Sequence, residues 1–284
     1  MSNSTFTSLL VTPEQLHAAL LGEQCNVVPL FTSMSPPGTS DSVIFPEQLI
    51  PNSLFFDFEY LFADPTALGM HMMPSAEQFT QAAKQLGINH NTTYVVYDDK
   101  GIFSAPRVYK MLVASGHQRV HILDGGLPAW LAKELPTQAE ISQTSVLGDF
   151  IARDQSVFIS KAQMLTIVAH QSHHIIDARG ADRFYARTPE PRLGMRAGHM
   201  PGAKNLPYSE CLENGYFKSL SQLDRLFSKL DIKSHDPIVF TCGSGVTACL
   251  LSVAAEICGF KNISIYDGSW SEWANDPNTP IVTD

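Results

Sequence analysis

The sequence predicts an α/β protein built from two copies of one domain, each a parallel sheet covered by helices on both faces. Short apolar strand candidates alternate with helical patterns along the chain. The two halves also align without a gap, because Gly116 pairs with Gly259 and Trp130 pairs with Trp273 at a constant offset of 143 residues. A length of 284 residues is long for one hydrophobic core and suits two domains.

The first copy carries clear signals for helix starts and buried strands. Thr12 and Gln15 form a capping box with proline at the first helical position, and Ser75 and Gln78 form a second box. Runs of β-branched and aromatic residues predict strands between the helices. The expected elements, in order, are a helix from Thr12, a strand at 26–31, a helix at 75–86, a strand at 93–99 and a helix at 104–116.

The second copy repeats these signals in the same order. Ser160 and Gln163 repeat the capping box, and the segment "SIYDGSWSEW" (264–273) aligns with "HILDGGLPAW" (121–130). The expected elements are a helix after Ser160, a strand at 174–178, a helix around 223–230, a strand at 237–242 and a helix at 247–259. We therefore predict a first domain at 1–135, a polar linker at 136–155 and a second domain at 156–284.

Composition narrows the functional classes. The net charge of −9 does not favour binding to nucleic acid or to an anionic membrane, and no apolar run is long enough to span a bilayer. The N-terminal segment "MSNSTFTSLLVTPEQ" has no basic residue, which argues against a secretory or transit signal. Five cysteines do not suggest a disulfide framework, so we expect a cytoplasmic protein with reduced thiols.

The strongest chemical signal is the segment "IVFTCGSGVT" (238–247), in which a cysteine follows a buried strand. Parallel sheets bind ligands beyond the carboxyl ends of their strands, where Cys242 is expected to lie. The small residues Gly243, Ser244 and Gly245 leave the backbone amides accessible, and the following helix adds its positive end. This arrangement favours a nucleophilic thiolate over a cysteine that only fills core space.

Comparison with the other copy and with other enzyme classes supports this interpretation. At the offset of 143 residues Cys242 aligns with Asp99, so the first copy has kept the fold without the nucleophile. A cysteine phosphatase needs an arginine six residues after its cysteine, where this chain has Ala248. No Cys-x-x-Cys pair is present, and His173 and His174 begin a strand, so we expect no metal site and no cofactor.

The loop "CGSGVTA", the segment "YDGSWSEW" and the upstream "RAGHMPGA" (196–203) carry a resemblance to a known family. The chain resembles the two-domain rhodanese sulfurtransferases, and more specifically the 3-mercaptopyruvate sulfurtransferases, over nearly its whole length. Members specific for thiosulfate usually have basic residues directly after the cysteine, where this chain has Gly243 and Ser244. The resemblance implies two rhodanese-like domains, of which only the second carries the cysteine.

The resemblance also implies which residues bind the substrate. Arg183 in an Arg-Phe pair and Arg192 in a Glu-Pro-Arg triplet match the two family motifs that grip the substrate, including their spacing. A solvated basic loop is the alternative. Arg179 and Arg196 would pair with carboxylates and fix the loop. The amides that would hold the outer sulfur of a persulfide belong to Gly243, Gly245, Val246 and Thr247.

A proton relay is implied for the release of pyruvate. Its members would be Ser244 of the loop, His71 in "GMHMMP" and Glu59 in "FFDFEY", although their spacing differs by one residue from the family pattern. Alternatively, "MHMMP" is a methionine-rich patch at the domain interface, and the sequence does not separate the two interpretations.

We therefore expect a 3-mercaptopyruvate sulfurtransferase that passes sulfur through a Cys242 persulfide to cyanide or to a thiol such as thioredoxin or glutathione. The alternatives are a thiosulfate sulfurtransferase and a non-catalytic binding module. A monomer is expected because duplicated halves could cover each other's exposed faces. Cys249 is expected in the core, whereas Cys25, Cys211 and Cys258 have no evident role, and a regulatory disulfide is left open.

Overall fold

The first half of the chain forms a five-stranded parallel sheet in the order β1-β5-β4-β2-β3. The computed structural model describes residues 6–22, 26–35, 43–153, 157–192 and 194–283. The strands of this sheet are β1 (Leu10–Val11), β2 (Val27–Thr32), β3 (Leu54–Phe55), β4 (Thr93–Asp98) and β5 (Val120–Leu123). Its helices are α1 (Pro13–Leu21), α2 (Ala76–Gln85), α3 (Ala105–Ala114) and α4 (Gly126–Ala132).

The second half repeats this topology with a parallel sheet in the order β6-β12-β11-β7-β8. Its strands are β6 (Phe158–Ile159), β7 (His174–Asp177), β8 (Ala203–Asn205), β11 (Ile238–Thr241) and β12 (Ile263–Tyr266). Its helices are α5 (Lys161–His170), α6 (Ala181–Phe184), α7 (Leu220–Lys229), α8 (Val246–Ile257) and α9 (Ser269–Trp273). A short 3-10 turn (Tyr208–Cys211) and the antiparallel pair β9 (Leu212–Glu213) and β10 (Tyr216–Phe217) precede α7.

Both faces of each sheet are buried, which confirms the predicted fold class. In β4, Tyr94 and Val96 belong to one hydrophobic core with α2 and α3, whereas Val95 and Tyr97 belong to another with α1 and α4. The same alternation in β11 places Val239 in a third core with α5 and α9. The predicted capping boxes are present at the starts of α1, α2 and α5.

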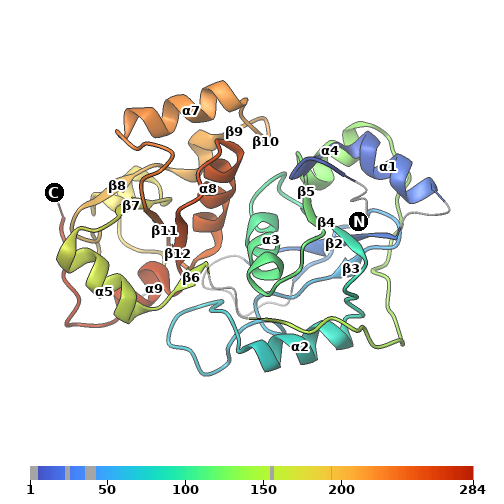
Figure 1. Ribbon diagram of the computed structural model, residues 1–284, viewed down its shortest axis with the longest axis horizontal. Coiled ribbons are helices and arrows are strands. Elements are labelled where there is room, and N and C mark those ends of the chain that lie inside the picture. Colours follow the sequence, from blue (N-terminus) through green and yellow to red (C-terminus); the bar gives the residue numbers. More distant parts are fainter. Residues whose placement is uncertain (1–5, 23–25, 36–42, 154–156, 193, 284) are drawn as a thin grey trace.

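The two domains share a continuous core, because α3 packs against α8 at their boundary. Figure 1 shows these two helices side by side between the sheets, with α7 and α2 on the outside. This contact brings the first domain close to the loop that carries the cysteine. No helix in the described ranges is both long enough and apolar enough to cross a bilayer.

The stretch predicted as a linker has no helix or strand between residues 136 and 153, and residues 154 and 155 lie outside the described ranges. It nevertheless packs onto the first domain. Gln138 forms a backbone bridge with Leu49, and Phe150 is fully buried against the rings of Phe79 and His117. The connection therefore contributes Phe150 to the core of the first domain.

Candidate active site

Cys242 lies directly after β11, in the loop that leads into α8, and only 2% of its surface is exposed. Gly245 ends this loop with a φ of 78°, a left-handed conformation that favours glycine. A Cβ at Gly245 would also lie 2.7 Å from the carbonyl oxygen of Asp267. The glycine is therefore needed for the turn and for the close approach of the β12–α9 connection.

Helix α9 fixes the loop through three hydrogen bonds. The carbonyl of Cys242 accepts from the amide of Trp270, and the carbonyl of Gly243 accepts from the amide of Ser271, both at 2.9 Å. The amide of Cys242 donates to Oγ of Ser269 at 3.2 Å. These contacts give the "YDGSWSEW" segment a role that the sequence did not reveal, since it holds the loop in its conformation.

The remaining loop amides are available to an external ligand. Within the part of the chain that the structure describes, no carbonyl or side chain accepts a hydrogen bond from the amides of residues 243–247. They lie at the N-terminus of α8, where the helix dipole favours negative charge. The loop can therefore bind an anionic sulfur attached to Cys242.

A cavity of about 190 Å³ opens on this loop. Cys242, Ser244 and Arg192 are among the residues that line it from the second domain, and Met34 and Phe103 contribute from the first. Of the loop residues expected to bind substrate, Gly243, Val246 and Thr247 also line the cavity, whereas Gly245 lies behind it. The site is thus shared between the two domains.

Two guanidinium groups face this cavity. Arg183 stands over Gly243, so that a Cβ there would lie 3.1 Å from its Nη2 atom, and the same atom donates to Oε2 of Glu190 at 2.5 Å. Burial and the charge of Arg183 lower the pKa of Arg192, while the carboxylates of Glu190 and Glu59 oppose that shift. Two cations that repel each other across a small cavity favour an anion bound between them.

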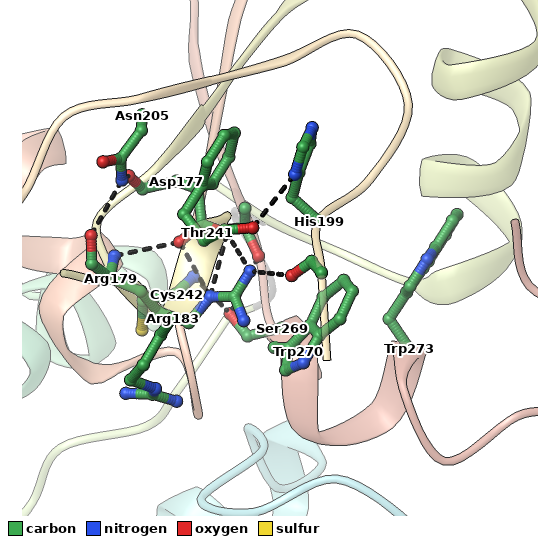
Figure 2. Close-up of polar contacts among 12 residues, drawn as sticks. Asp177, Arg179, Arg183, His199, Asn205, Thr241, Cys242, Ser269, Trp270 and Trp273 are labelled. Atoms are coloured by element: carbon green, nitrogen blue, oxygen red, sulfur yellow. Dashed lines mark hydrogen bonds and ion pairs between the residues drawn. The ribbon is translucent and has the colours of Figure 1, made fainter. Parts of the chain in front are cut away.

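A buried network orients Arg183. Arg179 donates to both carboxylate oxygens of Asp177 and, at 2.7 Å, to Oε1 of Glu190, and its guanidinium lies 4.2 Å from the ring of Trp270. Glu190 therefore joins Arg179 to Arg183. Figure 2 shows the Cys242 sulfur and the Arg183 side chain on one side of this network. The carboxylate pairing predicted for Arg179 is confirmed.

Arg196 differs from the expectation. Its guanidinium donates to backbone carbonyls, including those of Ala274 and Thr279 at 3.0 and 3.1 Å, and to the hydroxyl of Thr279. The prediction of carboxylate partners is therefore wrong for this residue. The chain after α9 curls around the side chain and presents its carbonyl oxygens, so Arg196 fixes this segment without an ion pair to any described residue.

His71 and Glu59 lie together in the first domain, with 3.8 Å between Nε2 and Oε1. Glu59 accepts hydrogen bonds from the amide and the hydroxyl of Ser35, both at 2.9 Å. Burial, reinforced by the charges of Arg107 and Arg192, lowers the pKa of His71 to about 3. The imidazole is therefore neutral at physiological pH, as a proton acceptor must be.

The third member of the predicted relay is less closely placed. Ser244 lines the cavity, yet no hydrogen bond joins it to His71 or Glu59 among the described residues. The next two residues after His71, Met72 and Met73, line a separate cavity of about 280 Å³ at the domain interface. The segment "MHMMP" thus provides both an interface patch and a buried histidine, and the relay itself stays a prediction.

The other cysteines do not form a second reactive site in the described ranges. Cys211, Cys249 and Cys258 are free thiols, and burial raises the pKa of each to about 12. Cys249 lies in the core, as expected, and Cys25 lies outside the described residues. No group of three or more His, Cys, Asp or Glu side chains in these ranges could hold a metal ion.

Comparison with known proteins identifies the family. A rhodanese-like domain model matches residues 37–133 and 160–276. The Escherichia coli 3-mercaptopyruvate sulfurtransferase is 37% identical over 252 residues, which cover 87% of this chain and 89% of that protein. The human enzyme of the same name is 40% identical over 233 residues, covering 81% and 78%. A chicken thiosulfate sulfurtransferase is 34% identical over 264 residues, covering 92% and 90%.

Comparison with a solved structure supports the same family assignment. The crystal structure of SseA, a 3-mercaptopyruvate sulfotransferase from Escherichia coli, matches with a TM-score of 0.83 at 32% identity and covers 93% of this chain and 99% of its own. Because the domain model matches most of the chain and the relatives align over most of their length, this protein belongs to the rhodanese-like family and carries two domains of the rhodanese fold.

Proposed function

We propose that this protein is a 3-mercaptopyruvate sulfurtransferase in which Cys242 carries the sulfur as a persulfide. The observation that carries the proposal is the arrangement at the cavity. The thiol lies beside loop amides that have no acceptor in the described structure, and Arg183 and Arg192 face it. The names of the relatives support the choice of donor.

The first half of the reaction forms the persulfide. The Cys242 thiolate attacks the sulfur of 3-mercaptopyruvate, so that a sulfur–sulfur bond forms and the carbon–sulfur bond breaks. The bonding electron pair leaves with the carbon as the enolate of pyruvate, which must gain a proton. That proton comes from the transferred sulfur, and Ser244, with His71 and Glu59 behind it, is the proposed route.

The two guanidinium groups and the loop amides have separate roles in this reaction. Arg183 and Arg192 bind the carboxylate and keto oxygens of the donor, because a planar guanidinium matches such paired acceptors. The amides of residues 243–247 stabilise the negative charge on the outer sulfur as it develops. In the second half of the reaction, an acceptor thiolate attacks this outer sulfur and regenerates Cys242.

The nearest alternative donor is thiosulfate, since one similar protein is named for it. The geometry favours 3-mercaptopyruvate, because the residues after the thiol are Gly243 and Ser244, and the Gly243 site is occupied by the Arg183 side chain. A Gly243→Arg, Ser244→Lys double variant should shift the ratio of activities toward thiosulfate. Unchanged donor selectivity in that variant would show that these two loop residues do not determine the choice of donor.

The physiological setting is part of the proposal. The acceptor is a thiol such as thioredoxin or glutathione, and the free thiols at the described cysteines suit a reducing, cytoplasmic environment. A monomer suffices, because the two domains of one chain already build the cavity together.

Intact mass spectrometry tests the function. The wild-type protein should gain one sulfur atom after incubation with 3-mercaptopyruvate and removal of excess donor, and dithiothreitol should remove it. Cys242→Ser should gain none, whereas Cys249→Ser serves as the matched control and should behave as the wild type. A gain with thiosulfate alone would select the alternative donor, and no gain with either donor would leave a binding module.

A further inference from the structure

Arg107 is a buried cation that the chemistry described so far does not use. It lies on α3 of the first domain, where this helix packs against α8, and its exposed fraction is 0%. A guanidinium in such a dry interface is costly unless it is paired and hydrogen-bonded. The groups that the Arg107 side chain contacts therefore indicate its role.

The Arg107 fork contacts three segments of the site. Nη1 donates to Oδ1 of Asp267 at 2.8 Å, and Nη2 donates to the backbone carbonyl of His71. Nη1 would also lie 3.4 Å from a Cβ at Gly245, so the guanidinium abuts the cysteine loop. The ring of Phe158 covers it at 4.5 Å.

Asp267 completes the connection, because its other oxygen accepts from the amide of Met73 at 2.7 Å. The segment from His71 to Met73 is thus held at both ends by the Arg107–Asp267 pair. His71 has a φ of 56°, a left-handed conformation that is costly for a residue with a side chain. This backbone therefore depends on contacts outside its own segment.

We propose that Arg107 is a positioning residue, which fixes the backbone of His71 against the Cys242 loop across the domain boundary. The inference rests on the proposed function in one respect, that His71 serves the proton relay. It extends that function by giving the first domain a defined structural task in the reaction.

Arg107 also acts on His71 through its positive charge. The groups that face His71 are the Glu59 carboxylate at 3.8 Å, which favours the imidazolium, and the guanidiniums of Arg107 and Arg192, which oppose it. Asp267 offsets part of the Arg107 charge. Removing Arg107 should raise the pKa of His71, although burial continues to hold it below the ordinary value.

Lys110 supplies a matched control on the same helix. It is also buried, with 1% of its surface exposed, and it pairs across the same interface with Oε1 of Glu256 at 2.5 Å. It has no recorded contact with His71, Asp267 or Gly245 within the described ranges. Loss of either cation removes one ion pair between the domains, but only Arg107 of the two adjoins the site.

The test compares Arg107→Met, Arg107→Lys and Lys110→Met. Arg107→Met should lower kcat for pyruvate release by about 30-fold with a much smaller change in KM, as displacement of a proton-transfer group does. Lysine keeps the charge but cannot reach both acceptors, so Arg107→Lys should lose most of the same activity. This variant still tests the proposal if Arg107→Met does not fold. Lys110→Met should lose stability without a selective loss of kcat.

Two further readouts separate the inference from the proposed function. The acid limb of kcat/KM, and the NMR titration of the His71 ring protons, should move to higher pH in Arg107→Met and stay in place in Lys110→Met. Equal losses of kcat in Arg107→Met and Lys110→Met, or an unmoved His71 titration in Arg107→Met, would overturn the positioning role. A wild-type protein that forms no persulfide would overturn the proposed function alone, because the titration does not depend on the donor.

Discussion

In both domains an equivalent loop follows the central strand, but the backbone amides of the two loops serve opposite roles. In the first copy the strand β4 ends at Asp98, whose carboxylate accepts hydrogen bonds from the following loop at 2.7 to 2.9 Å. The donors are the amides of Lys100, Phe103, Ser104 and Ala105. In the second copy Thr241 stands in the place of Asp98, and Cys242 follows it.

This difference shows what the shared backbone is built to do. The loop between the central strand and its helix concentrates amide donors at the carboxyl edge of the sheet. Burial raises the pKa of Asp98, and the amides of its loop oppose that shift by holding the carboxylate. The first copy therefore fills its anion site with its own side chain, whereas the second leaves the site open beside a thiol.

The largest expected effect comes from making the second loop resemble the first. Thr241→Asp should place a carboxylate among the amides of residues 243–247 and lower persulfide formation by about 100-fold or more, because an internal anion occupies the site. Thr241→Ser, which keeps the hydroxyl that donates to Ser269, is the control. Full activity of a folded Thr241→Asp protein would show that these amides do not hold the sulfur.

The reverse change tests the first loop. Asp98→Ala removes the acceptor of four amides, two of which are buried, so the free energy of unfolding should fall by about 3 kcal/mol or more. Asp99→Ala is the matched control, because among the described residues this carboxylate accepts a single hydrogen bond, from the hydroxyl of Ser33. Urea denaturation measures the difference, and equal stability of the two variants would contradict the role of Asp98. Persulfide formation per folded molecule should be unchanged in Asp98→Ala.

The cations that face the second loop give the next effect. Arg183→Met and Arg192→Met should each raise KM for 3-mercaptopyruvate by about 30-fold, the cost of losing a charged hydrogen-bond donor to a carboxylate. Arg187→Met is the control, because Arg187 lies in the same segment but is exposed, and Asp182 at 3.7 Å is its only acidic partner among the described residues. Steady-state pyruvate release measures KM. An equal increase in KM for Arg187→Met would indicate that the overall positive charge of the segment attracts the donor, rather than direct binding by Arg183 and Arg192.

The last comparison concerns the contribution of the first domain to the pH dependence of stability. The pKa of His71 is about 3 in the folded protein against an ordinary value of 6.5, so the unfolded chain binds more protons between these limits. Stability should therefore rise with pH across this window and level off above it. His71→Gln should flatten this part of the curve in denaturation measured at several pH values. His235→Gln, at an exposed histidine, should not.

Local signals explain why the fold could be predicted. Capping boxes at Thr12, Ser75 and Ser160 and apolar runs at the strands are short-range features, and the structure reproduces them. The cysteine loop was also readable, because the glycines and the strand before it are contiguous in sequence. The prediction of loop function therefore needed little information from distant parts of the chain.

Contacts between distant segments explain what the sequence did not show. Ser269 holds the cysteine loop from 27 residues away, and Arg107 reaches Asp267 across 160 residues. A charged residue in the mostly apolar segment "SAPRVYKMLVASG" was the only available signal for Arg107, and it does not identify a partner. The carbonyl partners of Arg196 were missed for the same reason, since backbone acceptors leave no trace in side-chain identity.

The central claim is that the open amide site of the second loop holds the transferred sulfur. A crystal structure of the wild-type protein after reaction with 3-mercaptopyruvate tests it most directly. The account predicts one additional sulfur on Cys242, within hydrogen-bonding distance of several amides of residues 243–247. A persulfide that points away from these amides, or a sulfur bound to another cysteine, would contradict it.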